Sequence, residues 1–195
     1  MKRVNELNKN MGCKWNKCMK RVLCSGFLFL LFTGTYAQRT VQAKFGDTLT
    51  THWIGVKITL TDSVFVEIDG PSKSWFALGL NTKRMQQGVD VIMVPAWKEA
   101  FMSIKPYDAV LTGYAPAKRD KLEHWVIKSE EMKNGRRVFS MARALATGDA
   151  EDFDFTQLAT TGGMFDVIWA MGTEKGNEVE YHENKRGKKT LGFTY

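Results

Sequence analysis

Cysteine is scarce in this chain, and all of it lies near the start. The 195 residues include three cysteines, Cys13, Cys18 and Cys24. If the first residues are removed on export, no thiol remains for a disulfide, a thiolate metal site or a cysteine nucleophile. The pattern Cys-x-x-Cys-His is also missing, which excludes covalent attachment of haem in the usual way.

Long apolar runs and the common catalytic motifs are missing as well. The apolar run at 22–32 is interrupted by Ser25 and Gly26, and it is too short to span a bilayer comfortably. The chain has no Gly-x-Ser-x-Gly elbow, no His-Glu-x-x-His pair and no Gly-x-x-x-x-Gly-Lys phosphate loop. These absences favour a binding or electron-carrying domain over an enzyme that acts on its own.

The first 37 residues have the pattern of a secretory signal peptide. Basic residues come first, the short apolar run follows, and small or turn-forming residues lead to Ala37. Translation from Met19 would give a more typical signal, so residues 1–18 are interpreted as a start-site artefact. An uncleaved membrane anchor is the less favoured alternative, and lipidation of Cys24 is not favoured because no small residues directly precede it. We therefore expect an exported protein, periplasmic or extracellular.

Removal of this leader changes the charge balance. The whole chain has 28 Lys and Arg against 21 Asp and Glu, and the leader holds seven of the basic residues and one of the acidic ones. Residues 38–195 then carry 28 − 7 = 21 basic and 21 − 1 = 20 acidic residues, a net charge near +1. The basic character of the whole chain is therefore no argument for nucleic-acid binding. These 195 − 37 = 158 residues suffice for a single domain with a substantial core.

The pattern of residues 38–195 is typical of short strands separated by Gly, Pro, Asn and Asp turns. The run 75–80 is apolar throughout and is predicted to be buried on both faces, as is 89–95. A short helical turn is expected within 149–158. So many short strands in one domain predict an all-β, immunoglobulin-like antiparallel β-sandwich. The predicted strands are 56–60 and 64–68, which form a hairpin, followed by 75–80, 89–95, 101–104, 109–112, 125–129, 137–144, 165–171 and 191–194.

Met85 and His182 are the candidate ligands of a haem iron. Met85 lies in a polar loop between two predicted buried strands, and a thioether there can ligate a soft metal. His182 lies near a strand end beside a glycine-ended loop. Because loops from distant parts of a sandwich gather at one end, these two side chains can take both axial positions of a non-covalent haem b, an arrangement used in electron transfer. The basic residues that flank them, and that can pair with haem propionates, are Lys83, Arg84, Lys185 and Arg186.

The residues alone leave other interpretations open. A loop methionine is more often a packing residue, and a lone histidine is more often merely polar. If the ligands lie elsewhere, Met93 and His124 are the next candidates. Arg143, Asp149 and Asp152 are interpreted as structural, with aspartates capping turn amides and the arginine pairing with them. A calcium site there is the weaker alternative.

The tryptophans bear on a carbohydrate-binding alternative. Trp75 and Trp169 are predicted to lie in the core. Trp97 and Trp125 are better candidates for an exposed sugar platform, unless they occupy half-buried strand positions.

Several short motifs follow one another along the chain in a specific order. They are the strand 75–80, Met85 followed by 90–94, the turn 143–152, and 169–172 followed by Tyr181, His182 and Arg186. The order and spacing of these motifs, over about residues 51–193, resemble those of the DOMON family. This β-sandwich family includes the haem-binding cytochrome domain of cellobiose dehydrogenase.

The resemblance implies a function for the chain. It implies haem b held by Met85 and His182 and the transfer of single electrons. Many haem-binding relatives are fused to a flavin dehydrogenase or a membrane cytochrome, so the redox partner here is expected in trans. Other relatives are thought to bind sugars, which makes a haem-free carbohydrate- or small-ligand-binding module the alternative. An isolated structural domain that contacts another envelope protein is a third idea.

Overall fold

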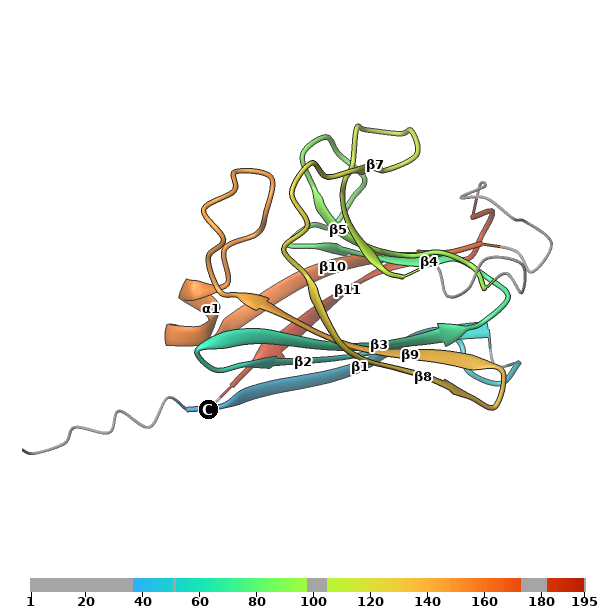
Figure 1. The fold of residues 1–195 in the computed structure, drawn as a ribbon, viewed down its shortest axis with the longest axis horizontal. Helices are drawn as coiled ribbons and strands as arrows, with labels where there is room; N and C mark the ends of the chain where they lie inside the picture. The colour runs from blue at the N-terminus through green and yellow to red at the C-terminus, as the bar shows by residue number, and fades with distance from the viewer. Residues whose placement is uncertain (1–36, 51, 98–104, 173–181, 195) are drawn as a thin grey trace, which may run out of the picture. The chain divides into compact units, whose positions relative to one another are not determined.

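The computed structural model describes residues 37–50, 52–97, 105–172 and 182–194. These residues form strands in two layers, with one short helix (Figure 1). No helix in these ranges is long and apolar enough to cross a membrane. The elements are β1 (Arg39–Asp47), β2 (His52–Leu60), β3 (Ser63–Pro71), β4 (Phe76–Leu80), β5 (Asp90–Val94), β6 (Tyr107–Val110), β7 (Lys118–Arg119), β8 (Val126–Lys133), β9 (Arg136–Ala144), α1 (Thr156–Thr161), β10 (Gly163–Met171) and β11 (Arg186–Phe193).

The strands form a five-stranded and a six-stranded antiparallel sheet. The order in the first is β1-β2-β3-β9-β8, and in the second it is β11-β10-β4-β5-β6-β7. All the pairings between neighbours are antiparallel. The predicted antiparallel β-sandwich is therefore confirmed.

Most of the predicted strands are present with different bounds: β2, β3 and β11 are longer than predicted, whereas β4 and β5 are shorter. β2 and β3 form the predicted hairpin, in which Leu60 pairs with Val64. The predicted strands 75–80 and 89–95 correspond to β4 and β5, and the helical turn expected within 149–158 lies slightly later, as α1. The predicted strand 101–104, residues 1–36 of the predicted leader 1–37, and Tyr181 lie outside the described residues.

The sequence did not predict β1 or β7. In β1 the apolar residues Val41, Ala43 and Phe45 alternate with exposed polar ones, but only Phe45 of the three is fully buried. Its position depends on pairing with β2 along its whole length. It also depends on Arg39, whose guanidinium donates to the carbonyls of Ala159 and Thr160 at the end of α1.

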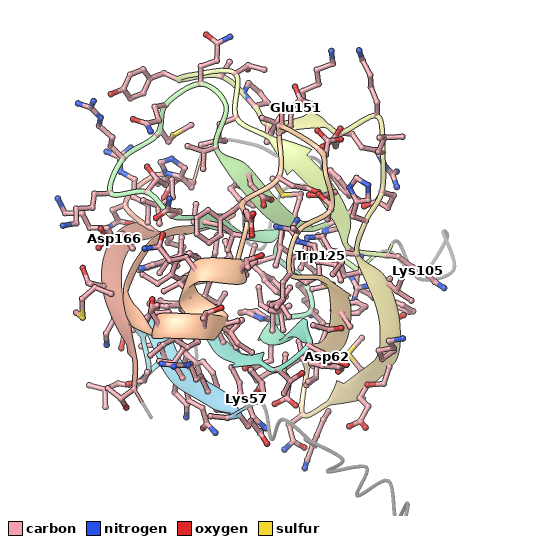
Figure 2. The ribbon with its side chains drawn as sticks, turned by 90° about the vertical axis from the view of Figure 1, so that its left-hand side faces the viewer. Lys57, Asp62, Lys105, Trp125, Glu151 and Asp166 are labelled. Carbon is pink, nitrogen blue, oxygen red and sulfur yellow. The ribbon has the colours of Figure 1, made fainter. Side chains whose placement is uncertain are left out.

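The main core lies between the two sheets. Alternate residues of the facing strands point into it, as expected for strands with two faces. Helix α1 lies at one end of the sandwich, which Figure 2 shows facing the viewer, and its Leu158 packs into this core. The strands β2 and β4 illustrate the alternation, with Ile54, Val56, Ile58 and Leu60 from the first and Phe76, Leu78 and Leu80 from the second.

A buried ion cluster links the two sheets. Arg143 on β9 donates from Nη2 to Asp90 Oδ2 on β5 at 2.6 Å, and from Nη1 to Asp152 Oδ1 at 2.9 Å. Its guanidinium also lies over the Trp125 ring, 4.5 Å from the ring centroid. Asp149 Oδ1 accepts the Glu151 N–H at 2.9 Å, which caps the turn before Asp152. The structural interpretation of these residues is confirmed.

Asp108 on β6 belongs to the same cluster and is less well compensated. Its Oδ2 lies 3.7 Å from Arg143 Nη1, and the residue is 1% exposed. Burial, together with repulsion from Asp90, raises the pKa of Asp108 to about 8, although the Arg143 charge acts in the opposite direction. Burial likewise raises the pKa of Asp90.

We expect Arg143→Ala to lower the free energy of unfolding by about 3–5 kcal/mol, because it leaves buried carboxylates without their counter-charge. Urea unfolding followed by tryptophan fluorescence measures this difference. Arg119→Ala is the matched control, since its pair with Glu123 lies at the surface and should contribute no more than about 1 kcal/mol. Equal losses in the two variants would contradict a linking role for Arg143.

Candidate functional site

The outer face of the six-stranded sheet is apolar, although the outer face of a sandwich sheet is usually polar. Every residue of β4 and of β5 is buried, so these strands are covered on both sides. This confirms the expectation for 75–80 and 89–95. A second apolar cluster, separate from the main core, covers this outer face and consists of Trp75, Ala77, Val89, Val91, Met93, Ala109 and Leu111.

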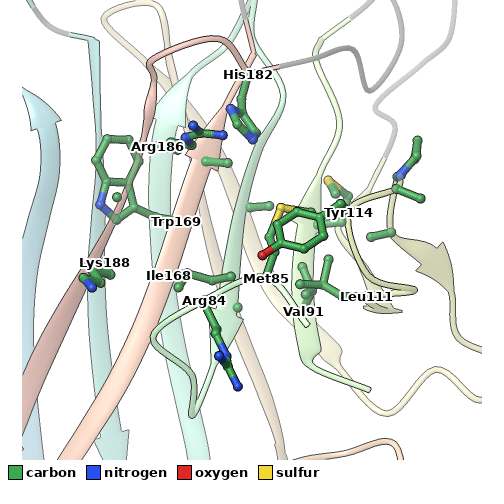
Figure 3. Close-up of a pocket in the computed structure, with 18 of the residues that line it drawn as sticks. Arg84, Met85, Val91, Leu111, Tyr114, Ile168, Trp169, His182, Arg186 and Lys188 are labelled. Atoms are coloured by element: carbon green, nitrogen blue, oxygen red, sulfur yellow. The ribbon is translucent and has the colours of Figure 1, made fainter. Parts of the chain in front are cut away.

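A cavity of about 830 Å³ opens on this apolar face. Its size falls within the range of about 300–1,000 Å³ that is usual for small-molecule and cofactor sites. Outward-facing residues of β4, β5 and β10 line it, together with the loops after β4 and β6 and the start of β11. Figure 3 shows the side chains of Met85, from the loop after β4, and Tyr114, from the loop after β6, around this space. It also shows His182, which comes from the segment before β11.

The strands beneath the cavity carry small side chains. Ala77 and Gly79 of β4 and Ala170 of β10 all line it. A Cβ atom at Gly79 would lie 2.7 Å from Ile168 Cγ1, so the glycine leaves room for the isoleucine of the neighbouring strand. These small residues form part of the cavity floor, which the apolar side chains of Val91, Met93 and Ile168 also line.

The cavity brings together the residues predicted from the sequence as cofactor-binding. Met85 and His182 both line it, although they are far apart in the chain. The predicted basic residues Lys83, Arg84 and Arg186 line it too, whereas Lys185 does not. Whether Met85 and His182 bind iron stays a prediction.

Met85 lies on a loop that is fixed at several points. Thr82 is buried, and its N–H donates to the Asp166 carbonyl at 3.0 Å. Its hydroxyl donates to the Arg84 carbonyl at 2.8 Å. The Gly88 N–H donates to the Leu111 carbonyl at 2.9 Å. Met85 itself is half-buried and packs against the outer apolar cluster.

His182 is oriented by its own loop. Its Nδ1 lies 3.0 Å from the Glu183 carbonyl oxygen, and because a carbonyl can only accept, Nδ1 carries the hydrogen. The neutral ring therefore has its lone pair on Nε2, the tautomer that binds a metal through Nε2. The His182 carbonyl accepts the Lys185 N–H, and the Lys185 carbonyl accepts the Met171 N–H, each at 2.9 Å. These bonds join the loop to the end of β10.

The charges around the cavity have one sign. Lys83, Arg84, Arg186 and Lys188 line it, and no Asp or Glu among the described residues does. Lys83 is held beside Asp166, with 3.4 Å between Nζ and Oδ2. A concave apolar site with a cationic rim favours an anionic ligand or a ligand with anionic groups.

The alternative residues have different positions. Met93 lines the cavity, but His124 belongs to the ion cluster, where its Nδ1 lies 2.8 Å from Asp152 Oδ2. The prediction that Trp125 is a candidate for exposure is wrong, because its ring is buried beside Arg143. Trp97 is half-buried against Arg137.

The two predicted core tryptophans both line the cavity. Trp75 is buried, as predicted, and Trp169 is half-buried and stacks on Phe45 with 6.1 Å between ring centroids. Tyr114, which the sequence did not predict, also lines the cavity and is 90% exposed. No local pattern marks it, because the fold of the loop after β6 brings it to this face.

Comparison with solved structures shows the same fold in a known protein. The cytochrome domain of Myriococcum thermophilum cellobiose dehydrogenase has a TM-score of 0.52 with 12% sequence identity, and the match covers 78% of this chain and 82% of that one. The cytochrome b domain of pyranose dehydrogenase from Coprinopsis cinerea has a TM-score of 0.44 with 17% identity, over 76% and 80% of the two chains. No protein-family model and no curated protein sequence matches the chain. The first likeness confirms, at the level of the fold, the resemblance to the cytochrome domain of cellobiose dehydrogenase.

We expect Ala77→Phe to be tolerated, because the added ring enters the cavity and not packed protein. Its free energy of unfolding should stay within about 1 kcal/mol of the wild type, measured by urea unfolding. Val66→Phe is the control, since Val66 lies in the packed core between the sheets, where overpacking costs about 1–3 kcal/mol. A loss of the same size at both positions would show that the space above Ala77 is filled.

Proposed function

We propose that this protein is an exported b-type cytochrome that carries single electrons. The observation that supports this most strongly is that a thioether and an imidazole, distant in sequence, line one apolar cavity on a cytochrome-type fold. Met85 Sδ and His182 Nε2 would be the axial ligands of a non-covalent haem b. Methionine and histidine together are an axial pair used for electron transfer.

The described residues fit a haem group in two ways. The floor of small residues suits a flat macrocycle, and the apolar walls suit its hydrocarbon surface. The rim supplies Lys83, Arg84, Arg186 and Lys188 for two propionates.

When bound, haem supplies a one-electron couple at its iron. The residues of this chain bind and orient it and adjust its potential. Methionine sulfur favours the ferrous state and raises the potential, and the apolar outer cluster limits access of water. The His182–Glu183 hydrogen bond sets the tautomer of the histidine. No residue of the cavity needs to make or break a bond in substrate, so the chain acts as a carrier and not as a catalyst on its own.

The proposal requires a redox partner in trans, such as a membrane cytochrome or a dehydrogenase. Much of the cavity rim is exposed, and its Arg84, Arg186 and Lys188 side chains lie at the surface. Electron transfer needs a close approach rather than a deep pocket, so an open rim suits this role.

Reconstitution with haemin tests the proposal. Titration of the purified protein with haemin, followed by reduction with dithionite, should give a low-spin Soret band and a sharp α-band. In Met85→Ala the spectrum should become high-spin, because the sixth ligand is lost, and His182→Ala should lose most haem binding. Met164→Ala and His52→Ala are matched controls outside the cavity and should behave as the wild type.

The variant Ala77→Phe distinguishes the loss of an iron ligand from the loss of space in the cavity. It keeps both ligands but fills part of the cavity, so it should bind haemin more weakly while remaining folded. A low-spin spectrum that persists in both Met85→Ala and His182→Ala would contradict the axial assignment. A protein that stays colourless with haemin and binds glycans would favour the haem-free alternative.

A further inference from the structure

A second group of potential ligands lies in the ion cluster and not in the cavity. Asp108, His124 and Asp152 each offer one ligand atom, and these atoms all lie within 4.8 Å of one another. Asp108 is on β6, His124 lies two residues before β8, and Asp152 is in the turn after β9. None of the three lines the cavity.

The cluster carries more negative than positive charge. Three buried carboxylates, those of Asp90, Asp108 and Asp152, surround one guanidinium, that of Arg143. Arg143 Nη2 is shared between Asp90 and the Phe153 carbonyl, and Nη1 donates to Asp152. With all three aspartates ionised, two negative charges remain uncompensated. Buried charges are stable only when they are paired or coordinate a metal.

Asp108 is the carboxylate that the cluster leaves unsatisfied. Its side chain is 1% exposed, and Oδ2 accepts no hydrogen bond from the described residues. The distance of 3.7 Å to Arg143 Nη1 is too long for a hydrogen bond. Asp108 has a carboxylate oxygen within 4.8 Å of ligand atoms of His124 and Asp152, and its unsatisfied Oδ2 points to a missing positive partner.

We propose that Asp108, His124 and Asp152 bind one divalent cation of borderline character, of which Zn²⁺ is the representative. One imidazole nitrogen and two carboxylate oxygens form a three-ligand set, and water completes the coordination. The imidazole disfavours Ca²⁺ and Mg²⁺, which prefer sets made only of oxygen. The two positive charges of the cation balance the two negative charges that Arg143 leaves uncompensated when all three aspartates are ionised.

The surroundings of the three ligands suit such a site. The two carboxylate oxygens of Asp152 have different partners. Arg143 donates a hydrogen bond to Oδ1, and His124 Nδ1 lies 2.8 Å from Oδ2. The Thr147 hydroxyl also donates to Oδ2, at 2.5 Å, and orients the carboxylate. The His124 side chain is 26% exposed, so an ion can enter from solvent on its side. Arg143 and the cation therefore bind different oxygens of Asp152.

Zinc titration of the full chain tests this proposal. The cysteines, Cys13, Cys18 and Cys24, are first alkylated with iodoacetamide so that no thiolate competes. Isothermal titration with ZnCl₂ should then show a saturable site with one equivalent bound, and Zn²⁺ should raise the melting temperature. In His124→Ala and in Asp108→Asn the affinity should fall by more than about 100-fold, beyond the 10–100-fold typical of residues outside the ligand shell.

The variants also separate binding from folding. Asp108→Asn keeps the shape of the side chain and replaces a carboxyl whose pKa burial raises to about 8 with a neutral amide, so without metal it should melt no lower than the wild type near pH 7. His52→Ala and His182→Ala should keep the zinc site, which makes the result independent of haem binding. Absence of saturable zinc binding by the wild type, or unchanged binding in His124→Ala, would overturn the proposal. Binding of Ca²⁺ in preference to Zn²⁺ would do the same.

Discussion

The apolar outer face of the six-stranded sheet is the constraint on which the rest of this structure depends. In a sandwich the space between the sheets supplies the core, and the outer faces meet water. Here β4 and β5 are buried on both sides, so the outer face needs a cover of its own. The loops after β4 and β6 supply part of that cover and leave a cavity above small side chains. A flat hydrophobic cofactor bound in this cavity would cover the rest of the apolar face.

Charges of opposite sign lie on the two sides of this sheet. The cationic residues line the cavity on the outer side, whereas the carboxylates of Asp90 and Asp108 point inward toward Arg143. The alternation of a strand produces this separation, because adjacent residues such as Asp90 and Val91 face opposite sides. A ligand with anionic groups is therefore favoured on the outer side and a cation on the inner side. The two proposed sites share no ligands.

Sequence reasoning succeeded where the signal was local or strongly patterned. The hairpin of β2 and β3 and the fully apolar runs of β4 and β5 could be read from residue type and turn chemistry. It failed for β1, whose side chains are largely exposed and whose place depends on β2 and α1. It also failed for Trp125, because burial of that ring comes from Arg143 on another strand. The distant partners are the Ala159 and Thr160 carbonyls for β1 and Arg143 for Trp125, and no local pattern links them to these residues.

The sequence alone determined the class of fold, the strands buried on both faces, and a short list of soft or basic side chains suited to haem. It could do so because alternation and residue chemistry are properties of a short stretch. Only the tertiary structure decided that Met85 and His182 line one cavity, that Tyr114 joins them, and that Asp108, His124 and Asp152 meet between the sheets. Those meetings depend on strand order and register, which bring together residues from β4 to β11, and no local pattern encodes them.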